Sequence, residues 1–271
     1  MQVRKLPATR GVAWLRDGVA LYRRNPLGLT GNVMLMFFCL LVALIFGQIL
    51  DQTLAELLPQ NLANFIGQLP FALLLPVLSV GVFNACRAIE RGERVLPGYL
   101  FSRLGPHLRP LLMLGGLYYL GSLLTLGLIS LTDDGLLFSV MQDLNKLNDK
   151  QLDMQTLRRS ALLLTLLSLV LTAANWFAPL LTGWRGLPPL KSAFFSIVAC
   201  WRNLRAFIVF GLACMGLFWI LLFCIGILLS FTPALGSLVT VLLPLLLVPI
   251  LYGAFYANVR DVLPELFDGE T

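Results

Sequence analysis

Side chains that could perform catalysis are few in this chain and do not form a catalytic pattern. Hydrolytic, acid–base or metal-dependent chemistry needs a nucleophile with a base, a pair of separated carboxylates, or a cluster of ligands. The sequence offers one histidine, His107, and two adjacent carboxylates, Asp133 and Asp134, which cannot flank a substrate by themselves. The five cysteines have no CxxC spacing. We therefore expect no catalytic residue, no metal ligand, no cofactor and no enzyme, with a membrane-embedded hydrolase built from Ser, Thr or Tyr as the alternative.

Polar side chains inside the long apolar stretches are neutral. Coupling to ions or protons usually leaves charged residues there, and these stretches contain none. They contain instead Gln48, Gln68, Ser79, Asn84, Ser122, Thr125, Thr165, Ser168, Thr172, Asn175 and Thr240. Asn84 and Asn175 are the predicted intramembrane polar contacts. Asn175 precedes Pro179 by one turn, where it can bond a neighbouring helix, a carbonyl that the proline leaves free, or a solute.

These residues must be positioned by helices that cross a membrane. The chain is 58% hydrophobic and 13% charged, against about 45–50% and about 25% in soluble domains. Five uncharged stretches cover residues 25–50, 57–86, 110–132, 160–184 and 206–259. One helical crossing needs about 20 apolar residues, and the last stretch can cross twice through a Pro–Gly turn at 231–236. The sequence thus predicts an all-α membrane protein with six transmembrane helices.

Lys and Arg are distributed unevenly between the two ends of these helices. Of the 20 basic residues, 16 fall before the first helix, in the second and fourth connections, or after the sixth helix. Cytoplasmic loops retain basic residues, so we predict a multi-pass protein of the bacterial inner membrane with both termini in the cytoplasm. The net charge of +6 then reflects orientation, and nucleic acid is not expected as a partner.

A pattern recurs about every 90 residues within what we predict to be a single membrane domain, residues 1–271. Three units cover residues 8–92, 96–186 and 187–264. Each unit consists of a cytoplasmic amphipathic or basic segment followed by a helical hairpin. The second unit also contains an external loop, 132–159, whose apolar residues follow helical spacing and predict an amphipathic helix over the outer face of the bundle.

Two of the opening segments have an apolar face and a polar face. The apolar face of the first comprises Val12, Trp14, Leu15, Val19, Leu21 and Tyr22. The third unit repeats this with Leu190, Phe194, Ile197, Val198 and Trp201, opposite Ser192, Ser196 and Asn203. Such helices are expected to lie in the membrane interface with the apolar face in lipid.

Both segments end in Arg followed by Asn, at residues 24–25 and 202–203. Asn is a common N-cap of a following helix, and Arg can reach lipid phosphate. The predicted headgroup contacts are Arg16, Arg23, Arg24, Arg103, Arg202 and Arg205. The expected partners are accordingly membrane lipids with anionic headgroups on the cytoplasmic face, with an envelope protein as a further partner.

The returning helix of each unit carries a proline followed by a glycine. The pairs are Pro76 with Gly81, Pro179 with Gly183, and Pro249 with Gly253. Proline kinks a helix, and small residues let neighbouring helices approach closely. We interpret these six residues as packing or kink positions, and the lining of a gate or ligand path is the alternative.

Three segments carry a resemblance to known proteins: YRRNP at residues 22–26, NACRAI at 84–89, and CWRN at 200–203. With them the chain resembles an uncharacterised family of bacterial six-helix inner-membrane proteins over nearly its whole length. More distantly, the repeated basic segment before a span is similar to the membrane domain found beside some glycerophosphodiester phosphodiesterases. The chain contains no soluble phosphodiesterase domain, so that activity does not carry over. The resemblance implies location and fold.

Two functions agree with these patterns. The first is a non-catalytic membrane protein that organises lipid, or binds an envelope partner, through its interfacial helices and external loop. The alternative is a channel or transporter for an uncharged or amphipathic solute such as lipid. A water-accessible cavity at the bilayer midplane lined by Asn175, Asn84 or Tyr252 favours transport, and a solid core favours the first function.

Overall fold

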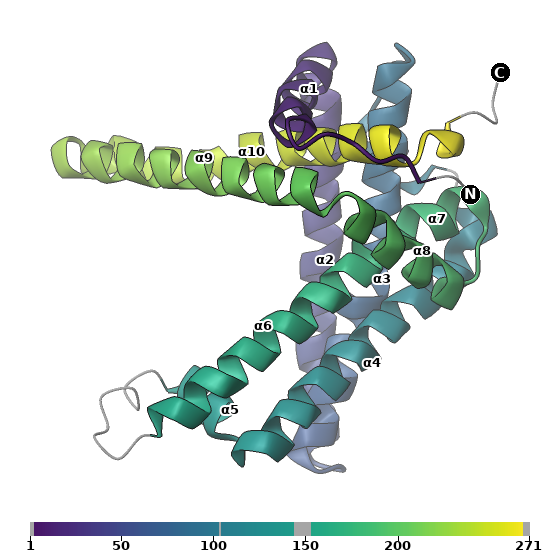
Figure 1. Ribbon diagram of the computed structural model, residues 1–271. Helices are drawn as coiled ribbons and strands as arrows, with labels where there is room; N and C mark the ends of the chain where they lie inside the picture. Colours follow the sequence, from purple (N-terminus) through teal and green to yellow (C-terminus); the bar gives the residue numbers. More distant parts are fainter. Residues whose placement is uncertain (1–2, 103, 144–152, 268–271) are drawn as a thin grey trace.

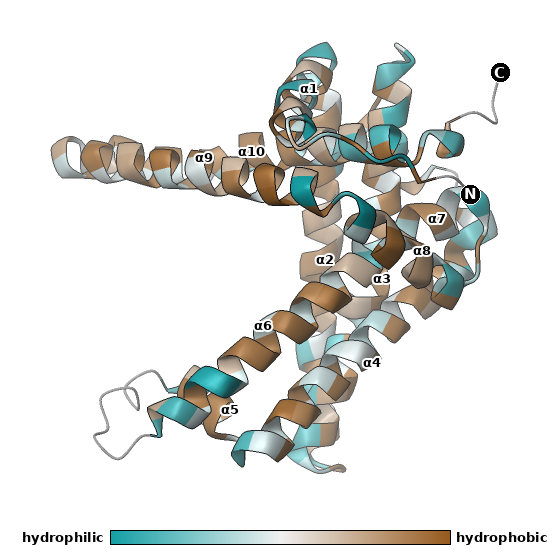
Figure 2. Cartoon of the chain, viewed as in Figure 1, coloured by the Kyte–Doolittle hydropathy of each residue, from teal (hydrophilic) through white to brown (hydrophobic). Residues whose placement is uncertain are grey.

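The computed structural model describes residues 3–102, 104–143 and 153–267, and within these ranges all regular elements are helices. Six helical segments are long and apolar enough to cross a membrane, which confirms the all-α membrane class. Their main helices are α2 (Pro26–Ala55), α3 (Gln60–Glu90), α4 (Leu108–Asp133), α6 (Met154–Trp176), α9 (Leu204–Phe231) and α10 (Pro233–Val262). Figure 2 shows mainly apolar residues along α9 and the upper part of α6, as expected of helices in contact with lipid.

Shorter helices join these six. They are α1 (Arg10–Arg24), α5 (Leu136–Gln142), α7 (Ala178–Arg185), α8 (Pro189–Arg202) and the 3₁₀ turns η1 (Pro97–Phe101), η2 (Gly105–His107) and η4 (Pro264–Leu266). Helix α5 covers part of the external loop in which an amphipathic helix is predicted. Residues 144–152 of that loop, and Arg103 among the predicted headgroup contacts, lie outside the described residues.

The long helices are arranged in pairs (Figure 1). Helix α2 packs on α3, α4 packs on α3 and α6, and α9 packs on α10. The α9–α10 pair runs across the direction of α2 and α3 and extends away from the other helices (Figure 1). Because the third pair differs in direction from the first, the threefold repeat stays a prediction.

The two Arg-Asn sequences have different roles. Asn25 caps α2, since its side-chain oxygen accepts a hydrogen bond from the Gly28 N–H at 3.0 Å. Asn203 makes no such cap on α9. It is buried, accepts from the Leu6 N–H at 2.9 Å and donates to the Arg4 carbonyl at 3.0 Å. The expectation of a cap is therefore wrong at Asn203, because the amide is used to hold the N-terminal segment.

The three prolines also differ in effect. Pro76 and Pro249 lie inside continuous helices, α3 and α10. Near Pro179 the helix divides into α6 and α7. At this break the Phe177 N–H donates to the Ser196 hydroxyl of α8 at 2.9 Å, so a side chain replaces the missing helical bond.

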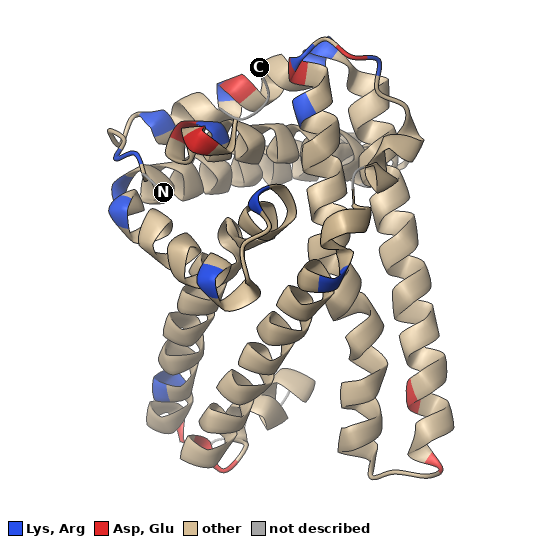
Figure 3. Cartoon of the chain, turned by 90° about the vertical axis from the view of Figure 1, so that its right-hand side faces the viewer, with Lys and Arg blue, Asp and Glu red and all other residues tan. Residues whose placement is uncertain are grey.

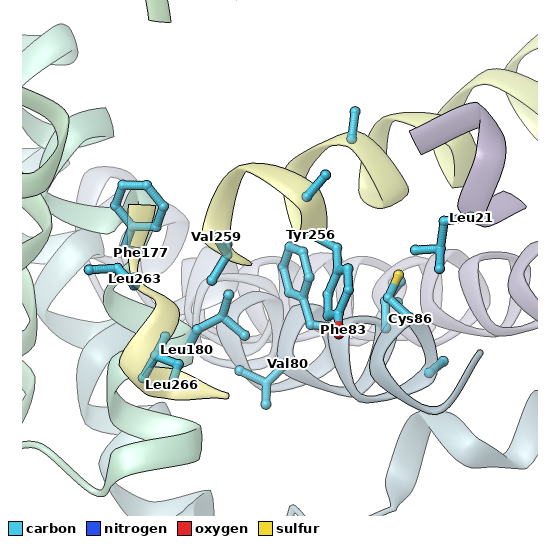
Figure 4. Close-up of a cluster of buried hydrophobic side chains, with 14 of the residues drawn as sticks. Leu21, Val80, Phe83, Cys86, Phe177, Leu180, Tyr256, Val259, Leu263 and Leu266 are labelled. Carbon is cyan, nitrogen blue, oxygen red and sulfur yellow. The ribbon is translucent and has the colours of Figure 1, made fainter. Parts of the chain in front are cut away.

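A core of buried hydrophobic side chains lies where the second half of α10 meets α3 and α7 (Figure 4). Tyr256, Val259 and Leu263 are at most 1% exposed there, and Phe83 and Leu180 pack around them. Helix α1 packs on α9 and α10 beside this core. Its Trp14 is fully buried, so the expectation that this apolar face inserts in lipid is wrong at its central residue.

Charged side chains connect α10 with α1 and with α3. Asp261 accepts from the Trp14 indole N–H at 2.9 Å and forms an ion pair with Arg10. Arg260 forms an ion pair with Glu90 of α3. The connection between α2 and α3 is acidic and lies at one end of these two helices. The Arg residues of α1 and of the connection after α3 lie at the other end (Figure 3).

Candidate functional site

Two cavities lie among the helices. The polar cavity, as we call it, has a volume of about 570 Å³ and lies between α2, α3 and α4, with Asn175 of α6 also in its wall. The apolar cavity has a volume of about 980 Å³ and is lined by α3, α4 and α6 to α10. Both volumes fall within the range of about 300–1,000 Å³ typical of small-molecule sites.

Polar side chains concentrate in the wall of the polar cavity. They are Gln48, Asp51, Asn64, Gln68, Tyr118, Tyr119, Ser122 and Asn175. Asp51 is half-buried near the end of α2, and Gln60 donates to its carboxylate at 3.4 Å. With its amide nitrogen turned toward Asp51, Asn64 donates to both carboxylate oxygens at 2.8 and 2.9 Å. The carboxylate is thus held by neutral amides.

Glycines bring the helices around the polar cavity close together. Gly47 of α2 faces Gly67 of α3, and a Cβ on Gly47 would overlap the Gly67 carbonyl oxygen. A Cβ on Gly115 of α4 would lie 2.5 Å from the Ala72 carbonyl oxygen. Backbones approach this closely only where both surfaces are small. These close contacts fix the three helices that carry the polar lining.

The apolar cavity occupies the angle between α6 and the α9–α10 pair. Its wall contains the aromatic rings of Phe83, Trp176, Phe207 and Phe255, among others. Cys200 of α8 also lines it, and burial raises the pKa of this thiol to about 12. The thiol therefore stays neutral, which suits an apolar wall.

The two cavities meet at shared wall residues. Leu75, Pro76, Tyr118 and Asn175 line both. Along α3 the combined lining runs from Asn64 to Phe83, which at the helical rise is about 28 Å, close to the hydrocarbon thickness of a bilayer. One end of this space carries more polar side chains than the other, although apolar surface predominates at both ends.

The structure separates the two asparagines that the sequence singles out. Asn84 donates to the Ser102 carbonyl at 3.0 Å and accepts from the Trp184 indole at 2.7 Å. It lines neither cavity, and it connects α3 with the residue directly after η1 and with α7. Asn175 lies in the wall of both cavities. Tyr252, which the sequence suggests as a cavity marker, lines the apolar cavity.

The three predicted glycines lie at close contacts between elements. Gly253 of α10 faces the backbone of Gly18 in α1, and a Cβ on Gly253 would lie 2.9 Å from the Gly18 carbonyl oxygen. A Cβ on Gly81 would overlap the Leu100 carbonyl oxygen of η1, and one on Gly183 would lie 2.9 Å from the Val80 side chain. Pro76 lies at the junction of the cavities, Pro179 is the second residue of α7 and lines the apolar cavity, and Pro249 is buried in α10.

Most of the predicted headgroup arginines are open to their surroundings. Arg16, Arg23, Arg24, Arg202 and Arg205 are exposed. Arg24 also donates to the Glu90 carbonyl at 3.2 Å, and Arg16 lies 3.9 Å from the Asp17 carboxylate. Contact with headgroups stays a prediction for all of them.

Several residues of the polar cavity are not singled out by the sequence. The sequence pattern indicates no role for Asp51, Asn64, Tyr118 or Tyr119. Their clustering depends on which faces of α2, α3 and α4 meet, and the glycines at 47 and 67 are the available signal. Among the described residues, no group of three or more His, Cys, Asp or Glu is placed to hold a metal ion.

One known protein is similar to the chain over nearly its full length. A probable inner membrane protein of Burkholderia thailandensis is 34% identical over 268 residues, which cover 96% of this chain and 93% of the relative. No family model and no solved structure match the chain. The similarity to the membrane domain found with glycerophosphodiester phosphodiesterases stays a prediction.

Proposed function

Because the chain belongs to the family of this probable inner membrane protein, we propose that it is a non-catalytic, multi-pass inner-membrane protein that binds and organises membrane lipid. The observation that carries the proposal is the pair of joined cavities. Lipid is the abundant molecule around these helices that has both a polar and an apolar part. The polar cavity accommodates a headgroup and the apolar cavity accommodates hydrocarbon chains.

Orientation is part of the proposal. With the basic end in the cytoplasm, both termini are cytoplasmic and the polar cavity opens toward the outer side of the membrane. Exposed arginines of α1, α8 and α9 then lie near anionic headgroups of the inner leaflet. Binding of an envelope protein stays a prediction from the sequence.

Filling the junction of the cavities tests lipid binding. Asn175→Trp places a large ring where the two cavities meet, and we expect fewer lipids to remain bound to the purified protein, counted by native mass spectrometry. Leu166→Trp is the matched control, since Leu166 lies on the same helix, is 60% exposed and lines neither cavity. Equal lipid counts in the wild type and both variants contradict the proposal.

Lipid transport is the second candidate function. It is favoured by the lining residues Asn175 and Tyr252, which the sequence names as markers of transport, and by the length of the combined lining. That lining is about 28 Å long along α3, and a path of this length extends over most of the hydrocarbon layer. We expect protein reconstituted in liposomes to move a fluorescent lipid between leaflets, measured by quenching from outside. Asn175→Trp should slow this movement and Leu166→Trp should not. If lipid moves between leaflets no faster in vesicles with the wild-type protein than in vesicles without protein, transport is contradicted. Lipid binding is not affected by that result.

A further inference from the structure

The charge of the cavity lining favours one class of lipid headgroup. Of the described residues that line either cavity, Asp51 is the one charged side chain, and neither Lys nor Arg is among them. Sites for phosphate or carboxylate usually contain Arg or Lys. A cavity with one carboxylate and neutral neighbours instead complements a positively charged group.

The position of Asp51 agrees with a headgroup contact. Helix α2 ends at Ala55, four residues after Asp51, so this carboxylate lies near one end of the predicted span. The Gln60 amide, and the Asn64 amide when its nitrogen is turned toward Asp51, orient the carboxylate without cancelling its charge. Gln48 and Gln68 line the same cavity and are exposed, so they can donate to a lipid phosphate at the mouth.

Aromatic rings complete the lining around the carboxylate. Phe71, Tyr118 and Tyr119 line the polar cavity together with Asp51. The Tyr119 hydroxyl donates to the Phe65 carbonyl at 2.9 Å, which fixes the position of its ring. Aromatic faces and a carboxylate together attract ammonium groups.

We propose that the polar cavity selects a membrane lipid with a primary amine headgroup, whose ammonium group lies at Asp51 and whose hydrocarbon chains extend into the apolar cavity. This inference rests on the proposed function, because it names the lipid class that the same cavities bind. It adds a prediction that lipid binding alone does not make. A single side chain, Asp51, should determine which headgroup is preferred.

The test measures lipid preference on the full-length purified protein. Protein stripped of lipid in a neutral detergent is offered phosphatidylethanolamine and phosphatidylglycerol in equal amounts with identical acyl chains, and the bound lipids are counted by native mass spectrometry. We expect the wild type to prefer phosphatidylethanolamine about tenfold, the effect of one charge-assisted contact. Asp51→Asn should bind as many lipids but lose the preference.

Two further variants make the test independent of folding at Asp51. Glu56→Gln removes an exposed carboxylate at the same end of α2 that lines neither cavity, and it should keep the wild-type preference. Gln48→Lys adds a positive charge three residues before Asp51 in the same cavity, so it should pair with the carboxylate and remove the preference, even where Asp51→Asn fails to fold.

The outcomes distinguish amine selection from lipid binding. Equal headgroup ratios in the wild type, Asp51→Asn and Gln48→Lys overturn amine selection and leave lipid binding intact. The proposed function itself is overturned if the wild type retains no lipid, or if its lipid count is the same as that of Asn175→Trp.

Discussion

Helices α1 and α8 share an amphipathic pattern and an Arg-Asn ending, yet they bury opposite faces. In α1 the apolar Trp14 is buried, whereas the basic residues Arg16 and Arg23 are exposed. In α8 the apolar Phe194 and Trp201 are 61% and 76% exposed. Amphipathicity therefore identifies two faces of a membrane-protein helix without telling which of them meets protein.

Specific partners explain each choice. Trp14 packs on Phe207 and Phe210 of α9, with ring centroids 5.7 Å apart in both pairs, and its indole N–H donates to Asp261. The buried side of α8 instead uses small hydroxyls. The Ser192 hydroxyl accepts from the Thr182 hydroxyl at 2.9 Å and is fully buried.

The solvent around the two helices accounts for the difference. Lipid is as apolar as a protein core, so exposed Trp201 costs little in a bilayer, while a buried serine must be hydrogen-bonded. In α8 the hydrogen bonds of the serines decide the buried face. In α1 the buried face is decided by the packing of the Trp14 ring and by the close contact of Gly18 with α10.

Removal of the Trp14 side chain should have the largest effect on this comparison. Trp14→Ala leaves a cavity between α1 and α9, and we expect the free energy of unfolding in detergent to fall by about 3 to 5 kcal/mol. Trp201→Ala, the matched change in α8, should alter it by less than about 0.5 kcal/mol. Equal losses in thermal unfolding would mean that both rings pack on protein.

Overfilling the contact of α1 with α10 should have the next largest effect. A Cβ on Gly18 would overlap the backbone of Ala254, so Gly18→Leu should destabilise the protein by about 1 to 3 kcal/mol. Gly216→Leu in α9 is the control, since nothing lies within 4 Å of its Cβ position. A similar melting temperature for both variants would show that α1 can move away from α10 without loss.

Removal of a buried hydroxyl tests α8. Ser196→Ala leaves the Phe177 N–H without its acceptor at the break between α6 and α7. We expect a loss of roughly 1 to 2 kcal/mol in the free energy of unfolding. Phe194→Ala on the opposite face of α8 should cost less, and the reverse order of melting temperatures would contradict the assignment of the buried face.

Exposed arginines should give the smallest change in stability and the same result in both helices. Arg23→Gln and Arg202→Gln should each change stability by less than about 0.5 kcal/mol. Each should lower the amount of anionic lipid that purifies with the protein, because a basic residue near an anionic leaflet contributes about 1 kcal/mol. Arg159→Gln is the control, because Arg159 lies near the start of α6, at the end of the membrane helices that is predicted to be external. Anionic lipid that falls equally in all three variants would argue against the assigned orientation.

The class of the protein and most of its helices could be predicted from local sequence. Long uncharged stretches predict six membrane helices because lipid offers no hydrogen-bond partner to an open backbone. The cap at Asn25 is also readable, since Asn before Pro is a local signal. Among the polar residues inside the apolar stretches, Gln48, Gln68 and Asn175 are identifiable one by one as polar groups in lipid.

How those residues come together follows from the packing of the helices. Packing places Asn175 in two cavities and encloses Asn84 between Ser102 and Trp184. Packing also determines that α1 buries its apolar face and α8 its polar face. It places the α9–α10 pair across the direction of α2 and α3. Sequence periodicity cannot make these choices, because lipid and protein interior attract an apolar face almost equally, and the choice depends on close backbone contacts and hydrogen bonds between segments far apart in the chain.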